Sequence, residues 1–362
     1  MKLTSLVPLL VVVLGSAVMI PRPAPGGEVP SLSQYKVLDP IRHGNLAVFP
    51  VVSTVSHDTQ EFLTLDEGLR SGEVVVNESG SIAPLVRPRH DGVTPRRGFG
   101  PQVNQLVLVN NSKRPLILLA GEIVTGGKQD RVIGKDRLVP AESDPIDLGV
   151  FCVEPGRWTG PKMSFDSLGS PMAAPGVRAK AMVDEDQGKV WSEVRDSQAR
   201  VAAQLTVPMA AAVGGTTSYA KVMQNEEVQK KVDSVAAPIR HDYQSLIGQL
   251  RDRHAVGVVV AVNGEIIWAD IFASTNLLEK YWPKLVRSYA AEAFVTRAGN
   301  GGADLKTAQQ FLEDFEGRRQ IVETEPGLYR HTEITGDSFK AFELTALLPR
   351  TGFDLHVAKM AE

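Results

Sequence analysis

The feature that most constrains the fold is the stretch VGVVVAVNGEIIWADIF at Val256–Phe272, two apolar runs joined at Asn263-Gly264. Asn-Gly is the preferred pair in a two-residue type I′ turn, because both central residues need a positive φ. The stretch therefore predicts a long antiparallel hairpin in the C-terminal part of the chain.

The rest of the chain predicts an α+β fold. Residues 31–160 form a β-rich domain, in which LAVFPVVS, GEVVVNE, NQLVLVNNS, RPLILLAGE and DPIDLGVFCVE read as strands bounded by turn residues. Residues 161–224 predict flexible loops and a helix. Residues 225–362 predict antiparallel hairpins with helices, packed with the N-terminal half as one unit, and Pro238 should break or kink one helix. Strands and helices do not alternate regularly, which disfavours a doubly wound sheet.

The N-terminus predicts export. Residues 1–30 contain one lysine, an apolar run over Leu6–Ile20 and the linker-like PRPAPGGEVP, the pattern of a secretory signal peptide. The alternative is a short membrane anchor, but the run is shorter than the ~20 residues of a spanning helix. We therefore expect a secreted or periplasmic protein without a stable membrane span after signal removal.

Charge and composition exclude several classes of site. The net charge is −3 with acidic and basic residues interspersed, which argues against nucleic-acid binding. The seven histidines show no metal-ligand spacing, so we expect neither a metal nor another cofactor. Cys152 is the only cysteine, which rules out an intramolecular disulfide, and its apolar setting LGVFCVE predicts burial.

The charged loop GEIVTGGKQDRVIGKDR, which begins at Gly121, directly follows a run that reads as a buried strand. It resembles a phosphate-binding P-loop only in the separation of Gly121 and Gly126. Gly127 stands where that motif has lysine, and Gln129 follows Lys128 instead of a hydroxyl residue. Nucleotide hydrolysis by a P-loop is therefore excluded.

Two glutamates suggest a different chemistry. Glu122 and Glu154 each follow a strand-like run, so both could face one cleft. Two carboxyl groups ~5–9 Å apart are the minimum for glycoside-type hydrolysis. The alternative is that the acidic residues pair with Lys128, Arg131 and Arg157 as a structural brace, because a buried carboxylate needs such partners.

The motif GEIVTGGKQDR followed by CVEPGRW, together with the later GVVVAVNGEIIWADIF and WPKLVRSYA, resembles a bacterial and archaeal family over most of residues 33–360. That family is named for its association with ADP-ribosylglycohydrolase and rhodanese-phosphatase superfamily proteins, and is a domain of unknown function. The resemblance implies a link to ADP-ribose or nucleotide-derivative chemistry. It marks as family residues Gly121, Glu122, Gly127, Lys128, Gln129, Asp130, Arg131, Cys152, Glu154, Arg157 and Trp158.

Three functions remain open from the sequence, and it does not decide whether the protein is an enzyme. In the first, the loop binds a small polar ligand: Lys128, Arg131 and Arg157 hold an anionic or hydroxyl-rich group, Gln129 orients it, and Trp158 stacks on it. Gly127 and Asp130 belong to the same loop. In the second, Glu122 and Glu154 hydrolyse a glycoside or an ADP-ribose-like substrate. In the third, the cluster braces a structural or interaction module.

Overall fold

The computed structural model describes residues 34–79, 103–157, 163–167, 172–296, 301–325, 327–347 and 352–362. The predicted signal peptide, residues 1–30, lies outside these ranges. Residues Leu32–Glu362 form one compact unit. Its helices accompany mostly antiparallel sheets, so the predicted α+β fold is confirmed.

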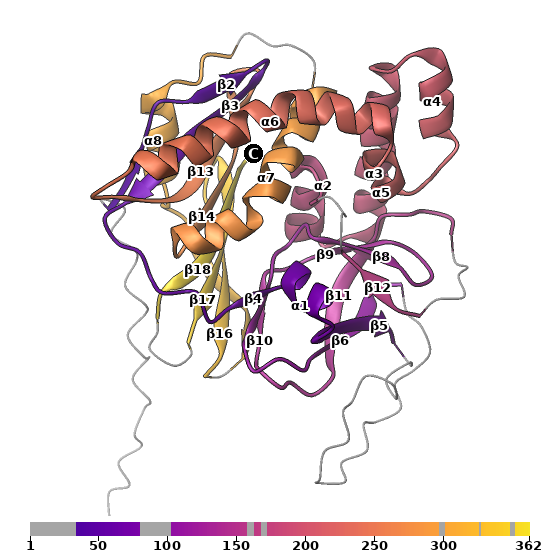
Figure 1. Cartoon of the computed structure of the whole chain (residues 1–362), viewed down its shortest axis with the longest axis horizontal. Helices are drawn as coiled ribbons and strands as arrows, with labels where there is room; N and C mark the ends of the chain where they lie inside the picture. The colour runs from indigo at the N-terminus through magenta and orange to yellow at the C-terminus, as the bar shows by residue number, and fades with distance from the viewer. Residues whose placement is uncertain are drawn as a thin grey trace, which may run out of the picture. The chain divides into compact units, whose positions relative to one another are not determined.

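A nine-stranded antiparallel sheet joins the two ends of the described chain (Figure 1). Its order is β1-β3-β13-β14-β18-β17-β16-β15, with β2 also paired to β3. The strands are β1 (Tyr35–Val37), β2 (Ile41–His43), β3 (Leu46–Ser53), β13 (His254–Val262), β14 (Glu265–Phe272), β15 (Arg318–Glu325), β16 (Tyr329–Thr335), β17 (Phe339–Ala346) and β18 (Asp354–Ala361). The N-terminal strands thus complete a sheet whose other strands come from the C-terminal part.

The predicted hairpin is confirmed as β13 and β14. Asn263 has a φ of 53° and Gly264 a φ of 78°, as a type I′ turn requires. Alternate residues of β13 enter different apolar clusters on the two faces of the sheet. Val258 and Val260 belong to the larger cluster, and Val259 belongs to the cluster that includes residues of α8 (Leu305–Glu313).

A second sheet closes into a small barrel. It has the order β12-β8-β9-β11-β6-β5 and consists of β5 (Val74–Glu78), β6 (Gln105–Asn110), β8 (Ile123–Gly126), β9 (Arg131–Ile133), β11 (Ile146–Cys152) and β12 (Phe165–Asp166). Asn77 forms an antiparallel bridge with Ser164, and the Glu78 amide donates to the Met163 carbonyl at 2.9 Å. These contacts join the first and last strands of the sheet, so the six strands form a closed ring.

A three-stranded sheet accompanies the barrel in the order β10-β7-β4. Its strands are β4 (Leu63–Thr64), β7 (Leu116–Leu118) and β10 (Arg137–Val139), and β4 runs parallel to β7. Apolar side chains of the barrel and of this sheet, among them Val76, Leu108, Leu118, Val124 and Val150, form one buried cluster.

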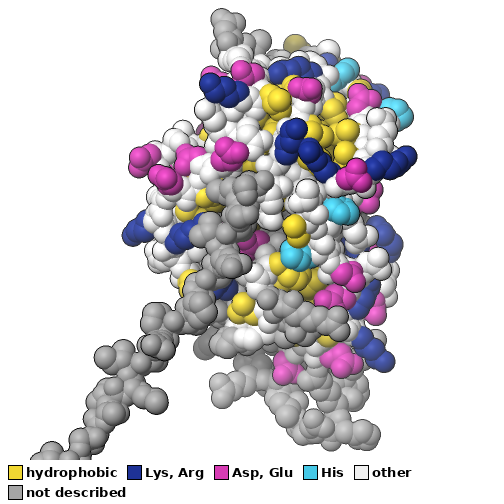
Figure 2. Space-filling view, turned by 90° about the vertical axis from the view of Figure 1, so that its left-hand side faces the viewer, with side chains coloured by type: hydrophobic (Ala, Val, Ile, Leu, Met, Phe, Trp, Pro, Cys, Tyr) yellow, Lys and Arg dark blue, Asp and Glu magenta, His cyan; other side chains and the backbone are white. Residues whose placement is uncertain are grey.

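Helices α6 (Glu226–Gln249) and α7 (Thr275–Val295) pack on each other along one face of the large sheet (Figure 1). The other helical segments are α1 (Leu65–Ser71), α2 (Pro175–Ala179), the π-helical turn η2 (Lys180–Asp184), α3 (Gln187–Ala203), α4 (Val207–Gly214) and α5 (Tyr219–Met223). Within the described residues, no helix has both the length and the apolar character needed to cross a bilayer. Acidic and basic side chains are interspersed on the face shown in Figure 2.

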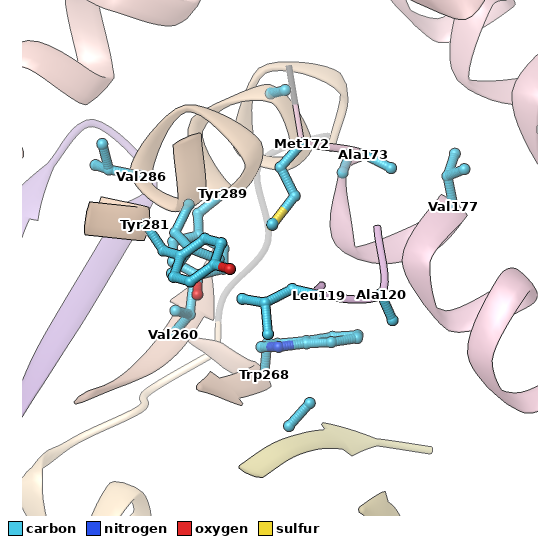
Figure 3. Packing of buried hydrophobic residues seen from close by; sticks show 14 of the residues in the cluster. Leu119, Ala120, Met172, Ala173, Val177, Val260, Trp268, Tyr281, Val286 and Tyr289 are labelled. Carbon is cyan, nitrogen blue, oxygen red and sulfur yellow. The ribbon is translucent and has the colours of Figure 1, made fainter. Parts of the chain in front are cut away.

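Two local predictions concern helical segments. Residues 161–224 were predicted to be flexible loops and a helix; in their described part the helix is α3, further helical segments flank it, and Met172 and Ala173 are buried in the main apolar cluster (Figure 3). Pro238 was predicted to break or kink a helix, and α6 continues through it without a break. Proline removes one helical hydrogen bond, but the buried face that includes Val232 and Ile239 stabilises the helix on both sides of it.

Candidate functional site

The charged motif predicted from the sequence lies at one end of the barrel. Strand β5 ends at Glu78, β8 ends at Gly126, β9 begins at Arg131 and β11 ends at Cys152. Arg131 is the register partner of Cys152, which places the ends of neighbouring strands at the same level. We call the polar residues there the charged cluster: Glu78, Lys128, Gln129, Asp130, Arg131, Glu154 and Arg157.

Asp130 and Glu154 fix the loop between β8 and β9. The Asp130 carboxylate accepts from the Gly126 amide at 3.1 Å and from the Ser218 hydroxyl at 2.7 Å. The Asp130 amide donates to Glu154 Oε2 at 3.2 Å, and Gln129 Nε2 donates to the Glu154 carbonyl at 3.1 Å. Both acidic side chains therefore hold the loop in one conformation.

Glu78 holds the same loop from the opposite strand, because its Oε1 accepts from the Lys128 amide at 2.7 Å. Gly127, the preceding residue, has a φ of +50°. A Cβ atom there would lie 2.2 Å from Phe165 Cζ and 2.6 Å from Glu78 Oε1. Only glycine fits this position, for reasons of both backbone conformation and space.

Arg131 is the buried centre of the charged cluster, with 0% of its surface exposed. Its Nε donates to the Val103 carbonyl at 2.7 Å and its Nη1 to the Gln129 carbonyl at 2.6 Å. Burial lowers the pKa of Arg131, and the surrounding acidic groups oppose this change. A guanidinium stays protonated under ordinary conditions, so Arg131 supplies a fixed positive charge. The ionisable side chains around it are Cys152, Glu78, Asp130 and Glu154.

Arg157 and Lys128 form the outer part of the cluster. Arg157 is about one third exposed, at 32%, and its Nε lies 2.8 Å from Glu154 Oε2. One Nη of Arg157 donates to the Gly126 carbonyl at 3.4 Å, and Lys128 is half-buried. Burial raises the pKa of Glu154, helped by the nearby Asp130 carboxylate. The cluster thus combines buried acceptors with partly exposed cations.

A hollow of about 480 Å³ lies on the barrel beside β5, the end of β8 and β12. Its lining includes Val75 from β5, Thr125 and Gly126 from β8, and Ser164 and Asp166 from the β12 segment. Gly126 therefore lines the hollow and also accepts the hydrogen bond from Arg157. This contact links Arg157 to a residue that lines the hollow.

Glu122 and Glu154 contact different groups. Glu122 Oε2 accepts from the Leu119 amide at 2.9 Å, and its Oε1 lies 3.5 Å from Lys284 Nζ. Lys284 also contacts Asp66 at 2.7 Å. Burial raises the pKa of Glu122 to about 7, although Lys284 lowers it. Only 1% of Glu122 and 2% of Glu154 are exposed, so neither presents an open carboxyl group.

A second buried charged network was missed from the sequence. Arg178 forms two hydrogen bonds to the Asp270 carboxylate, at 3.0 and 3.1 Å. His356 Nδ1 lies 2.5 Å from Asp136 Oδ2, its Nε2 lies 3.0 Å from Asp270 Oδ1, and the Tyr289 hydroxyl donates to Asp270. The two aspartates, Arg178 and His356 are each 0% exposed.

The geometry of this network fixes its charges. Both ring nitrogens of His356 face carboxylates, which only accept hydrogen bonds, so the ring is a doubly protonated imidazolium. Burial alone lowers the pKa of His356, but Asp136 and Asp270 raise it to about 9. With Arg178, the network contains two cations and two anions. It is balanced, closed to solvent and suited to holding segments together.

Arg178 also links this network to the start of the charged loop. Its Nε donates to the Ala120 carbonyl at 3.2 Å, and its guanidinium lies 4.5 Å from the centroid of the Trp268 ring. Figure 3 shows Ala120 and Trp268 in this part of the core. The only sequence signal was an acidic residue, Asp270, inside an otherwise apolar strand.

Two further sequence predictions concern this part of the chain. Cys152 is buried, as its apolar run predicted. Trp158, expected to stack on a ligand, lies outside the described residues, so its role stays a prediction. In the part of the chain that the structure describes, no three His, Cys, Asp or Glu side chains are placed to hold a metal ion.

The comparisons with known proteins give one result. No curated protein and no solved structure matches this chain. The family model of the ARG and Rhodanese-Phosphatase-superfamily-associated Protein domain matches residues 34–358, nearly the whole described unit. The chain therefore belongs to the ARG and Rhodanese-Phosphatase-superfamily-associated Protein domain family.

Proposed function

We propose that the charged cluster at the barrel end binds a small polar ligand, with Arg157 and Lys128 as its outer contacts. The observation that carries this proposal is the position of Arg157. Its Nε lies 2.8 Å from Glu154 Oε2 while one third of the side chain stays exposed, and it donates to the carbonyl of Gly126, a residue that lines the hollow. A fixed, partly exposed guanidinium is a good partner for a carboxylate or phosphate.

The rigidity of the loop supports the same proposal. Asp130 and Glu78 each accept from a backbone amide of the loop, at 3.1 and 2.7 Å. The polar groups of this loop are already held in place before a ligand binds, which reduces the entropy cost of binding. The mouths of β-barrels are also common positions for ligand sites.

One alternative has an observation of its own in favour. Glu78, Asp130 and Glu154 all accept from backbone amides, which is what a purely structural brace requires. A brace alone, however, needs no exposed guanidinium at its edge. The two-carboxylate hydrolase receives less support, because Glu122 and Glu154 have separate, buried surroundings.

The test is a thermal-shift and calorimetric screen of the mature chain against ADP-ribose, nucleotides, sugar phosphates and inorganic phosphate. A ligand at a hundred times its Kd adds about 2.7 kcal/mol of stability. The site variant is Arg157→Met, and the matched control is Arg195→Met on the exposed surface of α3. We expect a ligand bound by the wild type and the control, with at least tenfold weaker binding to Arg157→Met. Equal binding to all three proteins, or no binding to the wild type, would overturn the proposal.

We also propose that the protein is exported, on the basis of the apolar run in residues 1–30. Intact-mass measurement of the protein from the cells that naturally produce it tests this. A mature chain that has lost the N-terminal run and is found outside the cytoplasm supports export. An intact N-terminus on cytoplasmic protein contradicts it.

A further inference from the structure

The large sheet ends in an exposed strand. Strand β15 is the last strand on its path, and no element of the described chain pairs with its outer edge. Five of its side chains are fully exposed: Arg318, Arg319, Gln320, Ile321 and Glu325. An edge strand keeps a row of unpaired backbone N–H and C=O groups, which is a template for pairing with another chain. The outer edge of β15 can therefore accept one more strand.

The sequence of β15, RRQIVETE, is complementary to itself when it is read in the opposite direction. Ile321 and Val322 stand at its centre, and Arg318 and Glu325 are equally far from that centre. If two copies of β15 pair antiparallel about this centre, Arg318 of one protomer lies opposite Glu325 of its partner at each end. Opposite charges that face each other across two strands stabilise an antiparallel pair, and like charges destabilise it.

These side chains are free to make such contacts. Arg318 and Glu325 form no ion pair or side-chain hydrogen bond with the described part of their own chain. Their register partners on β16 are Thr335 and Tyr329, which carry no charge. Arg319 differs, because its Nη1 already donates to the Glu343 carboxylate at 2.8 and 3.1 Å. The two free charges of β15 are therefore the pair that the antiparallel arrangement brings together.

The centre of β15 is apolar. Ile321 is 56% exposed and is one of four large apolar side chains exposed in the described part of the chain. In the arrangement above, Ile321 of one protomer lies opposite Val322 of its partner. Pairing of the two strands removes apolar surface from water at the centre and neutralises charge at both ends.

A β-bulge lies at the same centre. The register of β15 with β16 shifts between Ile321 and Glu323, so Val322 is the extra residue. A bulge twists a strand and can keep an edge from pairing. A two-fold axis beside Val322 gives both strands the same bend at the same place, so the arms on either side can still align.

We propose that the outer edge of β15 pairs with β15 of a second copy of this chain, antiparallel and about a two-fold axis. The two large sheets then form one continuous sheet, with an Arg318–Glu325 pair on each side of the axis. A two-fold interface uses the same surface on both protomers, which a self-complementary strand provides. The residues of the charged cluster take no part, so the inference is independent of the proposed ligand site.

Light scattering coupled to size-exclusion chromatography measures the mass of the purified protein over a range of concentrations. A pair of strands makes a small interface, so we expect a reversible dimer whose share rises with concentration. Arg318→Glu and Glu325→Arg should each weaken the dimer about tenfold or more, because one substitution places like charges opposite each other at both ends. Arg195→Glu, on the exposed surface of α3, is the matched control and should leave the dimer unchanged.

Two restorations test the register. The double variant, Arg318→Glu with Glu325→Arg, exchanges the charges and should recover the dimer. An equimolar mixture of the two single variants should form a heterodimer, because two acidic side chains of one protomer then face two basic side chains of the other. Native mass spectrometry identifies the heterodimer by its mass. Mixing cannot repair a variant that has merely misfolded, and unfolding curves check that each single variant keeps the wild-type stability.

The outcomes decide the proposal. A wild type that stays monomeric at every concentration would overturn it, and the bulge would then serve to keep the edge from pairing. A dimer that both single variants form as tightly as the wild type would also overturn it, because the contact would lie elsewhere on the chain. Weakened dimers that neither the double variant nor the mixture restores would refute the pairing of Arg318 with Glu325. Restoration in both experiments would establish it.

Discussion

Replacing Asp270 by asparagine tests whether the buried network holds the fold together. Asparagine has nearly the same size, so the change removes one negative charge and creates no cavity. In the native protein, the Asp270 carboxylate accepts from Arg178 at 3.0 and 3.1 Å, from His356 at 3.0 Å and from the Tyr289 hydroxyl. After the substitution, two buried cations share the single remaining anion, Asp136.

The expected loss follows from this imbalance. Removing one partner from a buried ion pair costs about 3–5 kcal/mol, because the other charge stays buried without compensation. That is a large fraction of the roughly 5–15 kcal/mol by which a domain is stable. With an unfolding entropy of about 2.1 cal/mol/K per residue over roughly 330 residues, the melting temperature should fall by about 4–7 °C.

Urea unfolding followed by circular dichroism at pH 7 measures the change, with the exposed Asp252→Asn as control. Arg178→Met should also destabilise, but the double variant with Asp270→Asn should cost less than the sum, since His356 and Asp136 then balance each other. A loss below about 1 kcal/mol for Asp270→Asn, or strict additivity of the two changes, would refute the reasoning.

Three further predictions concern single residues. Gly127→Ala should destabilise the protein far more than Gly156→Ala. Gly156 also has a positive φ (84°), but a Cβ there would have no atom within 4 Å, so only about 1–2 kcal/mol of backbone strain applies. Equal melting temperatures of the two variants would contradict the steric argument. Burial raises the pKa of the Cys152 thiol, so a thiol reagent should label the protein in guanidinium and not in the native state at neutral pH, and stoichiometric native labelling would refute this. The pKa of His356 rises from 6.5 to about 9 on folding, so its contribution of about 3 kcal/mol to the free energy of unfolding is complete below pH ~6.5 and is lost as the pH rises towards 9. Urea unfolding at several pH values should show this loss of stability in the wild type and not in His356→Gln. A wild-type stability that does not change with pH would contradict the prediction.

The parts of the fold that local chemistry determines could be predicted. The hairpin at Asn263-Gly264 depends on two residues with positive φ, and the burial of Cys152 follows from its own apolar run. The continuation of α6 through Pro238 could not, because it depends on tertiary packing of the helix face, which outweighs one lost hydrogen bond.

The candidate site could be predicted only in part for a similar reason. The loop residues from Gly127 to Arg131 do come together with Glu154 and Arg157, since adjacent strands bring their ends to one edge of the sheet. Glu122 follows β7, which belongs to a different sheet from β11, and no sequence pattern distinguished the two. Asp136 and His356 are 220 residues apart in the sequence, and no local sequence pattern predicts a contact between them.

The pairing of β3 with β13 has a consequence for biosynthesis. Strand β3 is buried along its whole length; it pairs with β1 and β2 along one edge and with β13, which begins only at His254, along the other. A ribosome must therefore release about two hundred further residues before this strand acquires its partner, and contacts of such long range fold slowly. During that interval the apolar strand has an open edge that can pair with other chains. Expression of the first half alone should give aggregates, and a split made between the halves should restore soluble protein only when both pieces are produced together.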